Sequence, residues 1–121
     1  MSLPLLGLIL FSVTLSALAQ ICFKLGLTAR QADPGATLAQ SVLGALLNPG
    51  VLGGLALYGF GTLVWLLVLS KVEVSKAYPF VGLSFVVTAV LGHLIFKDDL
   101  NALRIGGIAL VIAGIALVAR S

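Results

Sequence analysis

Charged residues are scarce in this sequence. Of its 121 residues only 9% are Asp, Glu, Lys or Arg, whereas 60% are hydrophobic. Soluble domains are about a quarter charged, and one small core cannot hide so much apolar surface from water. The shortage of charge therefore favours a chain that lies in lipid. Its net charge of +3 comes from residues spread along the chain, so we expect no nucleic-acid partner.

Acids and metal-binding residues are also few. All four acids, Asp33, Glu73, Asp98 and Asp99, fall between the apolar segments. No carboxylate is thus available for a proton relay inside a membrane span. One Cys and one His can form neither a disulfide nor a zinc site. The sequence shows no pairing of a nucleophile with a base and no P-loop. We predict that the protein is not an enzyme and uses no cofactor or metal.

Long apolar segments are what the sequence has in abundance. A helix needs about 20 mostly apolar residues to cross a bilayer. Four segments qualify, namely Leu3–Phe23, Val51–Ser70, Ala77–Phe96 and Ala102–Ala119. Pro79 is expected in the first turn of the third helix, where a missing N–H costs little. We predict an all-α membrane protein in which residues 1–121 form a single domain of four transmembrane helices.

One connection, residues 27–50, is longer than the others. It begins with a turn signal, Asp33-Pro34-Gly35. Beyond it, apolar residues recur at helical spacing in a segment too short to span a membrane. We predict a short interfacial helix over Thr37–Leu47, capped by Thr37. A plain loop is the alternative.

The distribution of cations leaves the orientation of the chain open. Lys24, Arg30, Lys97 and Arg104 fall on one side of the membrane, and Lys71, Lys76 and Arg120 on the other. The positive-inside rule therefore gives almost no preference. Either the chain inserts both ways round or a partner sets its orientation. An antiparallel pair would form an inverted-repeat transporter.

The first helix carries a polar stripe at a spacing of four residues, formed by Ser12, Ser16, Gln20 and Lys24. Residues at this spacing share a helix face that drifts slowly round the axis. Polar groups are costly against lipid, so the stripe should face protein or a wet cavity. It either bonds to a neighbouring helix or lines a translocation path. Lys24 either snorkels to the membrane surface or binds an anionic headgroup there.

Other polar and aromatic residues also allow two interpretations. Trp65, on the second helix with Tyr58, is an interface anchor or a ligand contact. Tyr78, at the start of the third helix, binds substrate or belongs to an aromatic belt. His93 is a bonded helix-end residue or a proton carrier.

The fourth helix has small residues on one face. Gly107, Leu110 and Gly114 share this face, and small residues let helices approach closely in lipid. Four thin helices cannot readily enclose a sealed path alone. We therefore predict a dimer that pairs the fourth helices, with packing inside one protomer as the alternative.

These features resemble the small multidrug resistance fold of the drug/metabolite transporter superfamily, which includes EamA-like transporters. The resemblance rests on four spans in 121 residues, on Lys24-Leu-Gly26, and on the pattern from Gly107 through Leu110 to Gly114. It implies an antiparallel dimer joined by helix four, with the substrate chamber formed by helices one to three. The drug exporters carry a membrane glutamate eight residues before the helix-one lysine, where this chain has Ser16. Gly82-Leu-Ser84 also departs from their Gly-x-Gly pattern, so the resemblance does not imply proton-coupled drug export.

Within that superfamily the sequence is most similar to the paired flippase subunits for aminoarabinose linked to undecaprenyl phosphate. The similarity is carried by Ala19-Gln20-Ile21-Cys22-Phe23-Lys24, by the run Val64–Leu69, and by Ala77-Tyr78-Pro79. The longer first connection is a difference. The resemblance implies a bacterial inner-membrane transporter that flips an anionic amphipathic lipid, such as a polyprenyl-phosphate-linked sugar.

The same resemblance implies roles for individual residues. Lys24, assisted by Arg30, would bind the phosphate, and Ser16, Gln20 and Tyr78 would bind the sugar. The partner would be an identical chain or a related small subunit. Alternative functions are export of small molecules or drugs, and service as a non-transporting subunit of a membrane enzyme.

Overall fold

The described part of the chain is almost wholly helical. A computed structural model describes residues 3–29 and 35–121. Its elements are α1 (Leu3–Ala29), α2 (Leu38–Leu46), α3 (Pro49–Leu69), α4 (Val74–Ala77), the 3-10 helix η1 (Tyr78–Val81), α5 (Gly82–Phe96) and α6 (Ala102–Arg120). Four helical segments of this part are long and apolar enough to cross a membrane, with α4, η1 and α5 forming one of them. The prediction of an all-α membrane protein with four spans is confirmed.

Side-chain caps explain where several helices begin. The Asn48 side chain accepts from the Gly50 N–H, and Pro49 occupies the first turn of α3. Asn101 caps α6 in the same way through the Arg104 N–H. Thr37 and Gln40 form a reciprocal capping box at the start of α2. The short helix predicted after Thr37 is therefore confirmed, and it ends one residue before Leu47.

Two predicted boundaries were wrong. The first helix does not end at Phe23 but continues to Ala29, so Lys24 lies inside it. Lysine is a good helix former, and a single cation near a membrane edge does not stop a helix. The third span begins at Val74, so Pro79 is not in its first turn. Pro79 has no N–H for an α-helical bond, and the chain tightens there into η1.

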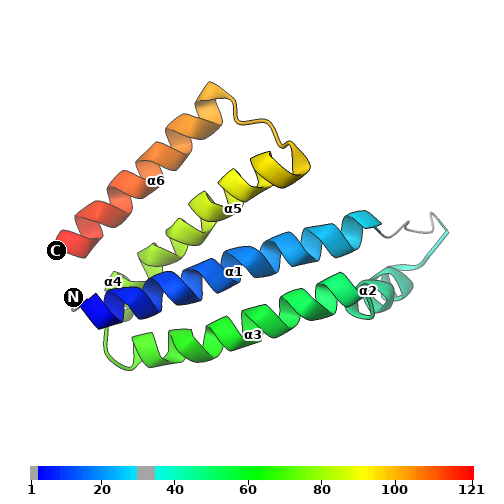
Figure 1. Cartoon of the computed structure of the whole chain (residues 1–121), viewed down its shortest axis with the longest axis horizontal. Helices are drawn as coiled ribbons and strands as arrows, with labels where there is room; N and C mark the ends of the chain where they lie inside the picture. The colour runs from blue at the N-terminus through cyan, green and yellow to red at the C-terminus, as the bar shows by residue number, and fades with distance from the viewer. Residues whose placement is uncertain (1–2, 30–34) are drawn as a thin grey trace.

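The main core lies near one end of the bundle. It contains Ile9 and Val13 of α1, Val68 of α3, Phe80 of η1 and Ile115 of α6. All four spans therefore meet at this level. Figure 1 shows both chain ends and α4 at this end of the bundle, with α2 at the opposite end. We call these the α4 end and the α2 end.

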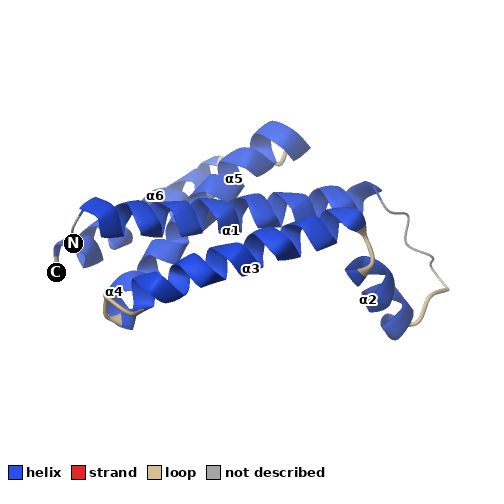
Figure 2. Cartoon of the chain, turned by 60° about the horizontal axis from the view of Figure 1, so that its bottom comes forward, coloured by secondary structure: helices blue, strands red, loops and turns tan. Residues whose placement is uncertain are grey.

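Helices α1 and α3 run side by side along their length (Figures 1 and 2). Near the α2 end they are held together by a glycine contact, because a Cβ built on Gly50 would lie 2.6 Å from the Gly26 Cα. Asn48 strengthens this contact by donating from Nδ2 to the Gly26 carbonyl at 2.8 Å. The start of α3 is thus tied to the last turns of α1.

Helix α6 is the least buried span. Only Ile115 is buried in it, whereas Leu110 is 76% exposed. A Cβ added to Gly107 or to Gly114 would meet no atom within 4 Å. Neither glycine therefore packs against another helix within the protomer.

Candidate functional site

A cavity of about 150 Å³ lies among α1, α3, η1 and α5. Its polar lining comes from six hydroxyl-bearing residues, which are Ser12, Ser16, Tyr58, Thr62, Tyr78 and Ser84. Trp65 adds an indole ring, and Val13, Gly61 and Val81 complete the wall. The cavity therefore combines neutral hydrogen-bonding groups with three aromatic side chains, and no charged side chain lines it.

The polar stripe of α1 passes through several environments. Ser12 is buried and donates from Oγ to the Gly61 carbonyl of α3 at 2.9 Å. Ser16 is half-buried and lines the cavity. Gln20 and Lys24 are exposed and do not line it. A four-residue step on a helix turns about 40°, so three steps turn the stripe about 120°. The stripe thus begins in an interhelical bond and ends on the outer surface.

Helix α3 supplies Tyr58, Gly61, Thr62 and Trp65, which lie three or four residues apart on one face. Thr62 satisfies its hydroxyl within α3 by donating to the Tyr58 carbonyl at 2.9 Å. A Cβ on Gly61 would lie 3.3 Å from the Leu15 Cβ. Glycine at this position therefore lets α1 and α3 approach closely beside the cavity.

The third wall comes from the segment that contains Pro79. Tyr78, in the 3-10 turn, lines the cavity but is 64% exposed as a whole residue. Ser84 also lines it and donates from Oγ to the Val81 carbonyl at 2.6 Å. The phenol of Tyr78 forms no hydrogen bond within the described part of the chain. It therefore remains available to a ligand.

The chemistry of this cavity suits the binding of neutral polar ligands. Hydroxyl groups donate and accept hydrogen bonds with neutral polar ligands, and aromatic faces pack against flat or apolar rings. Within residues 3–29 and 35–121, no three side chains of the His, Cys, Asp and Glu types cluster as a metal site would require. Among the described residues that line the cavity there is no Asp, Glu, His, Cys, Lys or Arg.

The structure brings together only some of the predicted site residues. Ser16 and Tyr78 lie in one cavity, whereas Gln20 lies outside it and Lys24 lies towards the α2 end. Arg30 falls outside the described residues. Sequence reasoning missed the contributions of Thr62 and Ser84. The α3 pair of Tyr58 and Thr62, four residues apart on an otherwise apolar helix, was a signal that could have been used.

His93 belongs to the end of α5. Its Nδ1 lies 2.8 Å from the Asp98 carbonyl oxygen, and Lys97 ends the helix with a left-handed φ of 59°. The interpretation of His93 as a bonded helix-end residue is thus supported by its geometry. It takes no part in the cavity.

Comparison with known proteins places the chain in a family. The model of the EamA-like transporter family matches residues 2–120. A relative from Pseudomonas fluorescens, named a probable 4-amino-4-deoxy-L-arabinose-phosphoundecaprenol flippase subunit ArnE, is 35% identical over 93% of this chain and 95% of its own. Proteins with the same name from Pseudomonas savastanoi and Proteus mirabilis are 35% and 31% identical, over 93% and 92% of this chain and 95% and 93% of their own.

No solved structure matches the chain. The family match nevertheless covers nearly the whole chain, and the four apolar helices agree with a membrane transporter. The chain is therefore a multi-pass protein of the bacterial inner membrane and belongs to the EamA-like transporter family.

Proposed function

We propose that this chain is a subunit of a flippase that moves a polyprenyl-phosphate-linked sugar across the inner membrane. The observation that carries the proposal is the near full-length similarity to proteins named as flippase subunits for such a lipid. The family match to EamA-like transporters supports transport as the general activity. We propose no catalysis for the chain, because its cavity holds no acid, base or metal ligand set.

The chemistry of the cavity supports a sugar as the group that enters the bundle. Sugars are neutral and rich in hydroxyl groups, and their C–H faces pack on aromatic rings. The lining offers hydroxyls such as Ser16 and Tyr78 beside the indole of Trp65. A volume of about 150 Å³ suits one sugar ring rather than a long oligosaccharide. The polyprenyl tail can stay in lipid during the passage.

The absence of acids from the spans supports an anionic substrate. The acids of the described residues, Glu73, Asp98 and Asp99, lie outside the membrane-spanning core of the helices. A carboxylate inside the bundle would repel a phosphate strongly in a medium of low dielectric constant. Lys24 is exposed on α1, where it can attract the phosphate, and we propose that Arg30 assists it. Gln20 lies one turn from each of Ser16 and Lys24 and would contact the sugar between them.

The exposed face of α6 supports assembly with a second subunit. Gly107 and Gly114 face open space in the protomer, and Leu110 between them is mostly exposed. Small residues on an open face in lipid favour close packing with another helix. The relatives are themselves named subunits. We propose a dimer through this face, with an identical chain or a related small subunit.

Reconstitution tests the proposed function. Proteoliposomes would carry an aminoarabinose-linked polyprenyl phosphate, and a membrane-impermeant amine reagent would report its arrival in the outer leaflet. We expect the wild type, alone or with its related subunit, to accelerate this arrival. Ser16→Leu should slow it by filling the cavity, whereas Thr14→Leu should not, because Thr14 is exposed and does not line the cavity. No acceleration by any combination would favour the non-transporting alternative.

A further inference from the structure

A second hollow, of about 570 Å³, lies at the α4 end of the bundle. It is formed by the start of α1, the segment that joins α3 to α4 together with α4 itself, and the end of α6. Figure 1 shows these three parts together at the end that holds both termini. The lining includes Leu5, Lys71, Glu73, Ser75, Lys76 and Val118. We call this hollow the basic groove.

The basic groove carries two cationic side chains and several hydrogen-bond donors. Two ammonium groups, of Lys71 and Lys76, and one carboxylate, of Glu73, line it, so its side chains alone sum to a charge of +1. The lining also includes Ser121, the last residue of the sequence. Lys76 is half-buried and donates from Nζ to the Ser121 carbonyl at 3.1 Å. An ammonium group has three hydrogens, so Lys76 keeps donors for a ligand. Lys71 has no ion-pair partner within the part of the chain that the structure describes.

The basic groove and the cavity are lined by neighbouring parts of the chain. Lys76 lines the groove and Tyr78 lines the cavity, only two residues apart in the chain. Ser16, by contrast, is eight residues from Lys24, which is about 12 Å along a helix. One sugar ring is much shorter than that distance. The sugar ring alone therefore does not span from Ser16 to Lys24, and a contact between its phosphate and Lys24 requires the lysine side chain to extend towards the cavity.

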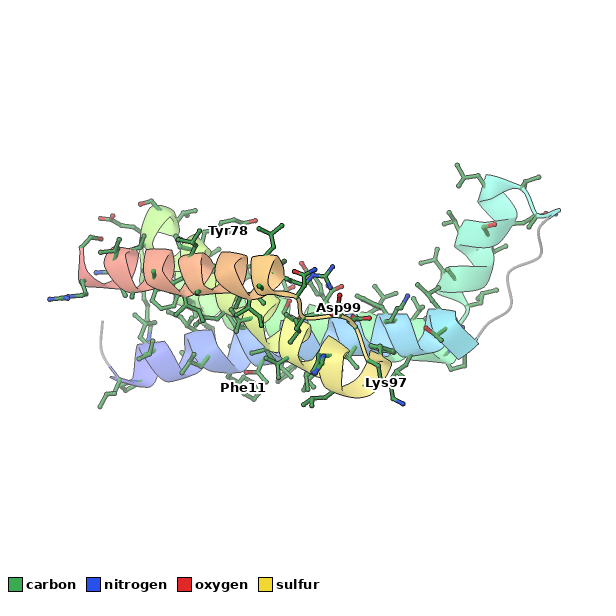
Figure 3. The ribbon with its side chains drawn as sticks, turned by 90° about the horizontal axis from the view of Figure 1, so that it is seen from above. Phe11, Tyr78, Lys97 and Asp99 are labelled. Carbon is green, nitrogen blue, oxygen red and sulfur yellow. The ribbon has the colours of Figure 1, made fainter. Side chains whose placement is uncertain are left out.

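Figure 3 shows where two of the labelled residues lie along the bundle. Tyr78 lies in the half that holds the chain ends, and Lys97 lies farther towards the α2 end, to which Lys24 also belongs. The cavity thus lies between two cationic regions at opposite ends. A substrate that passes from one membrane face to the other needs a phosphate contact at each.

We propose that the basic groove binds the phosphate group of an anionic lipid at the membrane face opposite Lys24. Lys71 and Lys76 supply the charge, and Ser75 supplies a hydroxyl donor. The inference rests on the proposed function for the identity of the lipid, but the binding site itself can be tested without transport. Lysines that only snorkel to the membrane surface would show no such binding.

Titration with farnesyl phosphate, a short polyprenyl phosphate, tests the groove. The full-length protein in neutral detergent would be titrated by calorimetry, and folding of each variant would be checked by circular dichroism. The test variant is Lys71→Gln with Lys76→Gln. The matched control is Lys97→Gln with Arg104→Gln, which removes the same charge from the α2 end, outside both the groove and the cavity.

We expect the test variant to bind farnesyl phosphate at least about tenfold more weakly, since charge-assisted contacts to phosphate are lost. Lys71→Arg with Lys76→Arg should retain most of the affinity, and the control should bind as the wild type does. Equal weakening of the test and control variants would indicate a general charge effect and overturn the proposal. So would unchanged affinity of the test variant.

Inorganic phosphate distinguishes the source of the anion. At the concentrations used for farnesyl phosphate it should not displace the lipid, because it lacks the apolar tail that lies against Leu5 and Val118. Complete displacement at equal concentration would assign the groove to free phosphate and overturn the lipid assignment.

If the wild type flips lipid while the groove variant binds and flips normally, only this inference fails. If the wild type binds farnesyl phosphate through the groove without flipping lipid, the proposed function fails and the groove remains.

Discussion

The contact between Gly26 and Gly50 sets how closely α1 approaches α3 at the α2 end, and Gly50→Ala tests its importance. A Cβ at position 50 would lie 2.6 Å from the Gly26 Cα and 2.9 Å from the Gly26 nitrogen. Because both are backbone atoms, the close contact cannot be relieved by rotation of a side chain. Carbon atoms in contact are normally about 3.5–4.0 Å apart. The two helices must therefore separate by about 1 Å.

The cost of this separation can be compared with a matched substitution. Overpacking a fitted interface typically costs about 1–3 kcal/mol. Replacing glycine by alanine in a helix otherwise stabilises it by up to about 1 kcal/mol. Gly53→Ala, on the same helix, should show that gain, because a Cβ there meets no atom within 4 Å. We expect Gly50→Ala to be less stable than Gly53→Ala by about 1–3 kcal/mol.

Unfolding of the reconstituted protein measures this difference. Both variants would be titrated with sodium dodecyl sulfate in mixed micelles and followed by circular dichroism. Gly50→Ala should also weaken the bond from Asn48 to the Gly26 carbonyl, and thereby shift the surface that carries Lys24. Equal unfolding free energies for the two alanine variants would show that the glycine contact does not limit the approach of the helices.

Three further predictions concern the cation, the bond between helices and the open face of α6. Lys24→Ala should lower the rate of lipid flipping about tenfold or more, because a charged contact to phosphate is lost. The liposome assay measures this rate, and circular dichroism should show an unchanged helical content. Ser12→Ala should reduce the free energy of unfolding by about 0.6 kcal/mol, the average for a hydrogen bond between membrane helices, and by no more than about 1.7 kcal/mol, because it removes the bond to the Gly61 carbonyl. Gly107→Leu and Gly114→Leu should abolish the dimer in crosslinking experiments, because a bulky side chain prevents close helix approach.

Two of these predictions have a matched control variant, and each has an outcome that would contradict it. Lys97→Ala, which removes another exposed cation from the α2 end, should leave flipping unchanged. Normal flipping by Lys24→Ala would show that Lys24 only extends to the membrane surface and does not bind the phosphate. Gly59→Leu adds the same bulk to an open position on α3. If it disrupts the dimer as strongly as Gly114→Leu does, the interface lies elsewhere. A Ser12→Ala variant as stable as the wild type would show that its bond adds nothing to the packing of α1 on α3.

The polar stripe of α1 shows why the site could be predicted only in part. The spacing of four residues correctly identified the helix, and it brought Ser16 to the cavity. It could not say how far the stripe would turn relative to α3. That depends on which face of α1 is buried, and the burial of Ile9, Val13 and Ala17 decides it. As a result Ser12 bonds to α3, whereas Lys24 reaches the surface.

The sequence by itself determined that this is a helical membrane protein. Long apolar segments, the cap at Thr37 and the scarcity of charge act locally, so they can be recognised without any knowledge of packing. Only the tertiary structure decided that Thr62 and Ser84 share a cavity with Ser16. It also placed Lys71 and Lys76 beside the end of α6. Both arrangements arise from contacts between helices that are distant in the chain, and apolar spans of similar composition can pack together in many ways.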